Sequence, residues 1–344
     1  MRILVTGGAG YIGSHAAQFL VGAGHEVTIL DSLSRGHLAA VDRLSASLDD
    51  EARGRLAFEQ ADIADTERVR SILTARGIEA VMHFAALAYV GESVTDPLTY
   101  HDNNTGAAVH LLRACDQAGV QRFVFSSTCA TYGEPEIVPI TENEKQRPIN
   151  PYGWSKLHTE RVLIDYAEAA KIEDKPFAFA GLRYFNVAGA DPSGVLGEWH
   201  KPETHLIPIV IEAALGKREH VTIFGTDYDT PDGTCIRDYI HVVDLAAAHL
   251  AVLERLEQGQ QRFYNLGIGN GYSVREVIEA AERVTGKKIP VKEGQRRAGD
   301  PPALFADASR IKSEIGWAAE RPELEGMIES AWKWYEANPN GYDA

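Results

Sequence analysis

The stretch Thr6-Gly7-Gly8-Ala9-Gly10-Tyr11-Ile12-Gly13 lies between a β-branched run, residues 3–5, and residues 13–23, whose apolar side chains recur at helical spacing. A glycine-rich turn that opens a helix directs backbone N–H groups toward a bound pyrophosphate. Glycines are needed there because a Cβ would block the close approach of the phosphates. The same run can also form an ordinary tight turn, so its meaning depends on the residues that come after it in the chain.

A carboxylate follows the second expected strand. Residues 27–30 form that strand, and Asp31 comes directly after it. In a dinucleotide-binding βαβ unit, an acid at this place accepts hydrogen bonds from the adenosine ribose. A carboxylate also repels a 2′-phosphate, so the sequence predicts NAD rather than NADP as the cofactor. Arg35 leaves a second possibility open, because an arginine beside Asp31 can bind that phosphate instead.

Strand and helix patterns alternate along the first half of the chain. Short β-branched runs are separated by segments with apolar residues three or four positions apart, which predicts an α/β fold with a doubly wound parallel Rossmann sheet. The expected strands are 3–5, 27–30, 56–58, 80–84, 123–126 and 177–182, and the expected helices are 13–23, 66–76 and 103–118. Two later apolar runs, 236–242 and 263–266, are expected to rejoin this sheet, and residues 273–285 and 322–336 to form helices.

A glycine- and proline-rich stretch, residues 187–205, indicates the entry to a smaller C-terminal α/β lobe. We therefore expect a Rossmann domain over residues 1–186, to which residues 237–266 return. The second lobe then comprises residues 187–236 and 267–344.

The charge and cysteine content exclude several classes of protein. With 34 Lys and Arg against 49 Asp and Glu, the net charge of −15 disfavours nucleic acid and anionic membranes as partners. No apolar run approaches the roughly 18 residues of a membrane span. Cys115, Cys129 and Cys235 have no metal-ligand spacing and indicate no disulfide framework. Because Met1-Arg2 runs directly into a strand, we expect no signal peptide and a cytoplasmic location.

A tyrosine and a lysine four residues apart follow the fifth expected strand. That strand closes at Thr128, and Tyr152 and Lys156 then share one face of a helix. A phenol has an unperturbed pKa near 10 and is a poor base at pH 7. An adjacent ammonium and a cationic nicotinamide ring both favour the phenolate, and the Thr128 hydroxyl can hydrogen-bond the same substrate oxygen. In an arbitrary sequence such a pair is usually an ordinary surface pair, but here it follows a dinucleotide-binding pattern.

The glycine turn together with Tyr152-x-x-x-Lys156 resembles the extended short-chain dehydrogenase/reductase family. Other segments are similar to one branch of that family, the UDP-glucose 4-epimerases, and these segments are residues 91–94 (GESV), 102–104 (DNN), 150–153 (NPYG), 183–186 (RYFN), 232–241 (DGTCIRDYIH) and 296–300 (RRAGD). The similarity covers nearly the whole chain, and the last two segments are typical of nucleotide-sugar enzymes. It implies a tightly held NAD, removal of the sugar O4 proton by Tyr152, hydride transfer from C4, rotation of the 4-keto sugar, and return of hydride to its other face.

The resemblance also implies roles for individual residues. Thr128 is the hydroxyl partner of Tyr152, and Lys156 also binds the nicotinamide ribose. The residues implied around NAD are Gly7, Gly10, Tyr11, Ile12, Gly13, Asp31, Asp62, Ile63, Phe84, Ala85, Ala86, Asn103, Tyr152, Lys156 and Tyr184. Those implied around the UDP-sugar are Thr128, Tyr152, Asn186, His205, Leu206, Thr222, Phe224, Arg237, Arg297, Asp300 and Leu304. Forked hydrogen bonds from the two arginines suit a pyrophosphate, and the Asp300 carboxylate suits a ribose hydroxyl. No metal ligand is implied.

Two positions depart from the pattern of many family members. Ala88 stands where some members have a lysine, which removes a cation beside NAD. Leu304 stands near the sugar C2 substituent, where small residues admit an N-acetyl group and a tyrosine tends to exclude it. We therefore expect UDP-glucose and UDP-galactose to be preferred over the N-acetylated pair. Trp154 faces away from the catalytic pair at helical spacing and is interpreted as a packing residue.

Other readings stay open. Dehydration is disfavoured because Cys129-Ala130 follow Thr128, where the related 4,6-dehydratases have an Asp-Glu pair. The UDP-xylose/UDP-arabinose 4-epimerases share residues 126–135 closely, so a pentose substrate is possible. A non-catalytic NAD-binding module is a third reading, although such a module has no need of Tyr152 and Lys156. The resemblance and the long helical regions 94–117 and 152–170 also suggest a homodimer that forms through a helical bundle.

Overall fold

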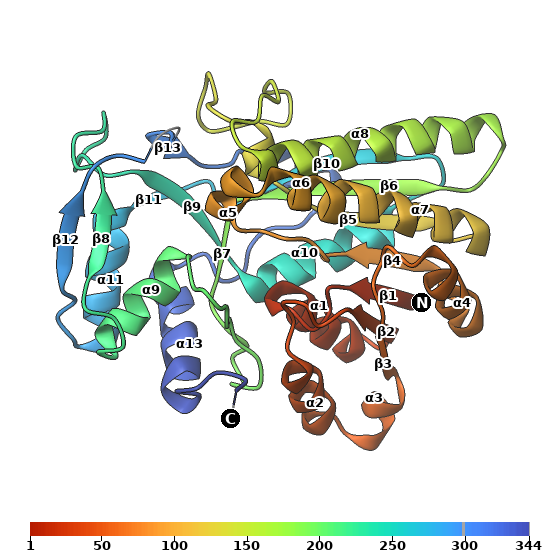
Figure 1. The fold of residues 1–344 in the computed structure, drawn as a ribbon, viewed down its shortest axis with the longest axis horizontal. Coiled ribbons are helices and arrows are strands. Elements are labelled where there is room, and N and C mark those ends of the chain that lie inside the picture. The colour runs from red at the N-terminus through yellow and green to blue at the C-terminus, as the bar shows by residue number, and fades with distance from the viewer. Residues whose placement is uncertain (298–299, 344) are drawn as a thin grey trace.

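The main sheet of the molecule has seven parallel strands in the order β10-β6-β5-β4-β1-β2-β3 (Figure 1). The computed structural model describes residues 1–297 and 300–343. The strands of this sheet are β1 (Arg2–Thr6), β2 (Glu26–Asp31), β3 (Leu56–Gln60), β4 (Ala80–His83), β5 (Arg122–Thr128), β6 (Ala178–Tyr184) and β10 (Gln261–Leu266). Chain order reverses between β1 and β4, which is where ligands bind in doubly wound folds. The predicted fold class is confirmed.

Helices cover both faces of this sheet. One face carries α4 (Thr66–Arg76), α7 (Ala107–Ala118) and α8 (Pro151–Ile172), and the other carries α1 (Tyr11–Gly22), α2 (Leu38–Ser47) and α10 (Val242–Arg255). Side chains of a strand alternate between the two faces of the sheet. In β1, Leu4 therefore packs against the face covered by α4, α7 and α8, while Ile3 and Val5 pack against the face covered by α1, α2 and α10. Shorter helical segments are α3 (Asp50–Gly54), α5 (Val90–Thr95), α6 (Pro97–Tyr100) and a 3₁₀ turn at Cys129–Thr131.

The second lobe lies beyond the carboxyl ends of the sheet strands, at the left of Figure 1. It contains a small sheet ordered β11-β9-β13 with β7 also paired to β9, and a two-stranded sheet of β8 and β12. Its strands are β7 (Asn186–Ala188), β8 (Val221–Phe224), β9 (Ile236–His241), β11 (Gly271–Ser273), β12 (Val291–Gly294) and β13 (Ala303–Leu304). Its helices are α9 (Leu206–Ala214), α11 (Val274–Thr285) and α13 (Leu324–Ala337), whereas α12 (Ser309–Ile315) packs against β10 and α10 beside the main sheet.

Two local predictions need correction. The run at residues 236–242 does not rejoin the main sheet: β10 pairs with β6 from Phe179 to Tyr184, so β9 pairs instead with β7, just beyond the end of β6. Of residues 237–266, α10 and β10 therefore lie with the main sheet and β9 does not. The helix expected at residues 103–118 begins as a π-helical turn, His101–Gly106, and becomes α-helical only from Ala107, in α7. Such turns are frequent at functional sites.

No helix among the described residues has both the length and the apolar character that a bilayer crossing requires.

Candidate active site

One cleft of about 1720 Å³ runs along the carboxyl edge of the main sheet and into the second lobe. The register explains why residues distant in sequence meet there, because Thr6 is level with His83 across β1 and β4, and Thr128 is level with Tyr184 across β5 and β6. Every residue that the resemblance implies around NAD or the UDP-sugar lines this cleft. The structure therefore brings both predicted sets together, while their individual roles stay predictions.

The glycine turn forms the cofactor end of the cleft. Gly7 has a positive φ of +69°, and a Cβ there would lie 2.6 Å from the backbone nitrogen of Ala85. A Cβ on Gly13 would lie 2.2 Å from the carbonyl oxygen of Gly7. Helix α1 begins at Tyr11 with no acidic residue in its first turn, so its free N–H groups face the cleft without competition. This backbone cradle fits a pyrophosphate.

Asp31 closes the adenosine end. Its buried carboxylate accepts hydrogen bonds from the backbone N–H groups of Ala9 (3.0 Å) and Leu33 (2.8 Å). Burial raises the pKa of Asp31, and these two hydrogen bonds oppose that rise. Arg35 does not pair with Asp31, because its Nη2 lies 2.7 Å from Oε1 of Glu92. This pairing with Glu92 holds the Arg35 guanidinium away from Asp31, which favours a free ribose diol over a 2′-phosphate.

The middle of the cleft is lined by short and flat side chains. Phe84, Ala85 and Ala86 follow β4, and the Phe84 ring packs 4.8 Å from the ring centroid of His249. Asn103 lies in the π-helical turn and lines the same wall. The Tyr184 hydroxyl is hydrogen-bonded to the Ser126 hydroxyl.

The start of α8 positions the predicted catalytic pair, Tyr152 and Lys156. The Asn150 side chain accepts a hydrogen bond from the backbone N–H of Gly153 (2.8 Å), and Pro151 occupies the first helical position, so the helix begins at a defined place. A Cβ on Gly153 would lie 2.5 Å from the carbonyl oxygen of Ala130. The helix therefore packs directly on the turn that follows Thr128.

The protonation states of the pair differ from the simple expectation. Burial raises the pKa of Tyr152 to about 12, and a hydrogen bond with Thr128 opposes this rise. Lys156 is buried, its Nζ donates to the carbonyl oxygen of Ser126 (2.8 Å), and burial lowers its pKa to about 7. The ammonium therefore does not by itself produce a phenolate. The positive charge of a nicotinamide ring is what the site needs to lower the pKa of Tyr152 toward neutrality.

The second lobe supplies the basic end of the cleft. Arg237, on β9, pairs with Asp300, so this carboxylate is engaged by an arginine as well as being available to a ribose. The Arg297 guanidinium carbon lies 3.9 Å from the ring centroid of Phe224 on β8, a cation–π contact. Leu304 is level with Arg237 across β13 and β9 and is half-buried. Residues 298 and 299 of the RRAGD segment lie outside the described residues.

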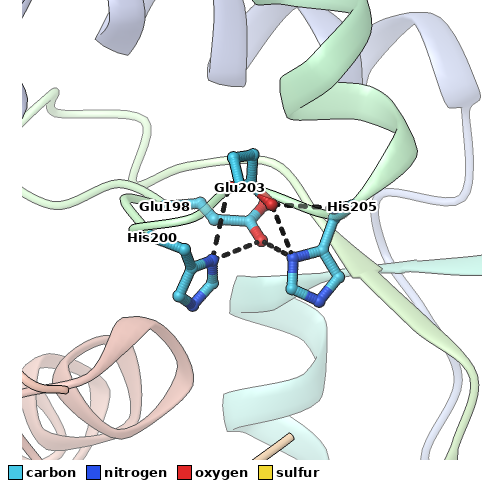
Figure 2. A group of neighbouring side chains, drawn as sticks. All are labelled: Glu198, His200, Glu203 and His205. Atoms are coloured by element: carbon cyan, nitrogen blue, oxygen red, sulfur yellow. Dashed lines mark hydrogen bonds and ion pairs between the residues drawn. The ribbon is translucent and has the colours of Figure 1, made fainter. Parts of the chain in front are cut away.

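Two features were missed or misread in the sequence. Glu198, His200 and Glu203 line the cleft beside His205 and form a cluster with it (Figure 2). The spacing Glu-x-His-x-x-Glu-x-His is the signal that could have found them. Trp154 packs on His158, with the two ring centroids 5.6 Å apart, but it is 41% exposed in the single chain. Helical spacing gave its direction correctly, but exposure depends on what packs beyond the helix.

Comparisons with known proteins agree with this site. The family model described as "NAD dependent epimerase/dehydratase family" matches residues 3–267. A UDP-glucose 4-epimerase from Halalkalibacterium halodurans is 47% identical over 99% of this chain and 98% of its own. UDP-arabinose 4-epimerase 1 from Arabidopsis thaliana is 46% identical over 99% of this chain and 81% of its own.

The solved structures include a UDP-glucose-4-epimerase from Stenotrophomonas maltophila with bound NAD and formylated UDP-arabinopyranose. It has a TM-score of 0.92 and 42% identity, and the match covers 98% of this chain and 99% of that chain. NAD is the cofactor of this family, and the cradle at Gly7 and the carboxylate of Asp31 fit it. The chain therefore belongs to the NAD dependent epimerase/dehydratase family, in the branch that contains the UDP-glucose 4-epimerases.

Proposed function

We propose that the protein interconverts UDP-glucose and UDP-galactose by oxidising the sugar at C4 to a 4-keto sugar and reducing it again from the other face. One observation supports the proposal: Tyr152, Lys156 and Thr128 line the same cleft as the glycine turn and as Arg237 and Arg297. Bound NAD supplies the chemistry by accepting a hydride and giving it back. Because the hydride is given back, the net reaction consumes no cofactor.

The chain's own groups do the rest. Tyr152 takes the proton from O4 during oxidation and returns it during reduction, and the Thr128 hydroxyl holds the same oxygen. Lys156 donates hydrogen bonds from inside the cleft and keeps a positive charge near the phenol when it is protonated. Arg237 and Arg297 hold the diphosphate, so the sugar is attached through one flexible end and can turn while the nucleotide stays in place.

A pentose substrate is the second candidate. UDP-arabinose 4-epimerase 1 from Arabidopsis thaliana is 46% identical, almost as similar as the UDP-glucose 4-epimerase from Halalkalibacterium halodurans at 47%. A pentose lacks the C6 hydroxymethyl group, and the catalytic groups named above contact only O4 and C4. The choice between the two therefore rests on the pocket wall rather than on Tyr152 or Thr128. A non-catalytic module is disfavoured because such a protein has no need of Tyr152 beside a buried Lys156.

The assembly and location belong to the same proposal. Val94, Leu98 and Trp154 are exposed apolar side chains on α5, α6 and α8, which pack on one another beside α7 (Figure 1). We infer that this patch forms the contact between two copies of the chain. The three cysteines are free thiols, which suits a reducing cytoplasm. A role in galactose metabolism follows from the proposed reaction.

The deciding experiment is purification without added cofactor, followed by assays with UDP-galactose, UDP-GalNAc and UDP-arabinose in parallel. We expect NAD(H) to accompany the protein and UDP-galactose to be converted fastest. Faster turnover of UDP-arabinose would assign the pentose reaction instead. Bound NAD without any turnover would establish the non-catalytic module.

A further inference from the structure

A compact group of nitrogen and oxygen donors lies at the edge of the cleft, outside the catalytic pair. Glu198, His200, Glu203 and His205 come from one segment that leads into α9, and each offers one donor atom to a common centre (Figure 2). These four atoms lie within 4.8 Å of one another. Across residues 1–297 and 300–343 this is the one group of three or more His, Cys, Asp or Glu residues with such geometry.

The two carboxylates of this group are deeply buried. The side chains of Glu198 and Glu203 are 5% and 3% exposed, and the cationic partners found for them in the described chain are the two histidines. Taking a carboxylate out of water is costly unless a positive charge or a metal compensates it. The group therefore attracts cations strongly.

The arrangement suits a metal ion better than protons. Nδ1 of His205 lies 3.1 Å from Glu198 and 2.9 Å from Glu203, and Nδ1 of His200 lies 3.3 Å and 3.4 Å from the same two residues. A single N–H points well at one acceptor, yet each imidazole nitrogen here faces two. Tetrahedral zinc with bonds of about 2.0–2.1 Å places its ligand atoms roughly 3.3 Å apart. The His–Glu distances already match that spacing, and the widest pair has to close by about 1.5 Å.

The ligand chemistry is also suitable. Imidazole nitrogen and carboxylate oxygen are ligands that zinc prefers, and four protein donors make a closed structural site rather than a catalytic one. Backbone N–H groups of Thr204 (2.7 Å) and His205 (2.8 Å) donate to Oε1 of Glu203, which orients that carboxylate in the way second-shell contacts orient metal ligands. The backbone of its own loop thus holds the Glu203 carboxylate in place.

We propose that Glu198, His200, Glu203 and His205 form a structural site for a divalent transition-metal ion, with Zn²⁺ as the best fit. The ion fastens residues 198–205 at the boundary between the two halves of the molecule. On one side the His200 ring lies 6.4 Å, centroid to centroid, from the ring of Tyr11 at the start of α1, and on the other side the segment leads into α9. The site thereby sets the position of one wall of the cleft. This inference does not depend on which sugar the protein converts.

The test measures metal directly. Purified wild-type protein is treated with a chelator, dialysed against Zn²⁺, passed through a desalting column and analysed for zinc by mass spectrometry. We expect about one zinc ion per chain in the wild type and a loss of affinity of at least roughly tenfold in His200→Gln and in Glu198→Gln. His110→Gln is the matched control, because His110 is exposed and far from the group in the chain. It should bind zinc like the wild type.

Two further readouts keep the proposal testable if a variant folds poorly. Wild-type protein loaded with Co²⁺ should show the intense visible absorption of tetrahedral cobalt, and Zn²⁺ should raise its melting temperature by mass action. Circular dichroism checks that each variant is folded. Equal zinc content in the wild type and in folded His200→Gln overturns the proposal. So does a wild type that retains no zinc and gives no tetrahedral cobalt spectrum.

Discussion

Arg183 and Glu160 form a two-point ion pair beneath the strand that carries Thr128. Nε and Nη2 of Arg183 lie 2.9 Å and 2.7 Å from the two carboxylate oxygens of Glu160, and both side chains are buried. Glu160 also accepts a hydrogen bond from Ser127, the neighbour of Thr128, and Arg183 donates to the Tyr132 hydroxyl (3.0 Å). The pair thus ties together β5, α8 and β6, the elements that supply Thr128, Lys156 and Tyr184.

Removal of one member of this pair leaves the other as an unpaired buried charge. We expect Arg183→Met or Glu160→Gln to lower the free energy of unfolding by about 3–5 kcal/mol. Urea denaturation followed by circular dichroism measures it. Arg161→Met is the control, because Arg161 is an exposed arginine on the same helix that makes one side-chain contact of 3.3 Å. A cost below about 1 kcal/mol for both pair variants would contradict the structural role of the pair.

Replacement of the proposed base separates chemistry from binding. Tyr152→Phe removes the hydroxyl that carries the O4 proton and keeps the ring, so turnover should fall by about 10²–10⁴ while the fold and NAD content stay unchanged. Thr128→Ala should be less severe, because it removes one hydrogen bond rather than the base. Steady-state kinetics and the NAD content of each variant provide the test. Activity of Tyr152→Phe within a few-fold of the wild type would rule out Tyr152 as the base.

Cofactor choice depends on Asp31. After removal of the cofactor, reconstitution should strongly favour NAD over NADP, because a buried carboxylate would face the 2′-phosphate and Arg35 is held by Glu92. Recovery of activity at increasing concentrations of each cofactor measures the preference. Glu92→Gln is a useful companion variant, since it frees Arg35 without touching Asp31. Equal activity of the wild type with both cofactors would show that Arg35 governs this end of the cleft.

Substrate breadth should depend on Leu304. This side chain lines the cleft and packs with the buried group around Tyr132 and Phe185. An apolar wall discriminates by only about 1–3 kcal/mol, so we expect UDP-GlcNAc and UDP-GalNAc to be converted poorly rather than not at all. Leu304→Ser should raise the activity with UDP-GalNAc relative to that with UDP-galactose. An unchanged ratio would mean that Leu304 serves only in packing.

The proposed dimer contact predicts a clear change in mass. The Leu98 side chain is 80% exposed on α6, so a charge there should cost little in the single chain but much in a contact between apolar patches. Leu98→Asp should convert a dimer to a monomer in light scattering after gel filtration. Ile172→Asp is the control, because Ile172 is 86% exposed but lies at the opposite end of α8. A monomeric wild type, or a Leu98→Asp variant that stays dimeric, would contradict the proposed contact.

Several features could be derived from the sequence because they depend on neighbours in the chain. The glycine turn, Asp31 after β2, and the four-residue spacing of Tyr152 and Lys156 are local patterns, and the backbone geometry of a strand or helix converts them directly into positions. Alternating strand and helix periodicity likewise predicted the parallel sheet, because a crossover helix leaves few other ways to pair consecutive strands. The residues of these local patterns all line one cleft in the folded chain.

Other features required the tertiary structure because they depend on which distant groups meet. The sequence of the strand at 236–241 does not say which strand it pairs with, and in the folded chain it pairs with β7 rather than with the main sheet. Arg237 on β9 meets Asp300 in the segment before β13, and the pKa of Tyr152 is raised by burial that no local pattern encodes. Spacing in the chain records which residues can be near each other along one element. Only tertiary packing decides which distant residues and charges become their neighbours, and which of these neighbours are shielded from water.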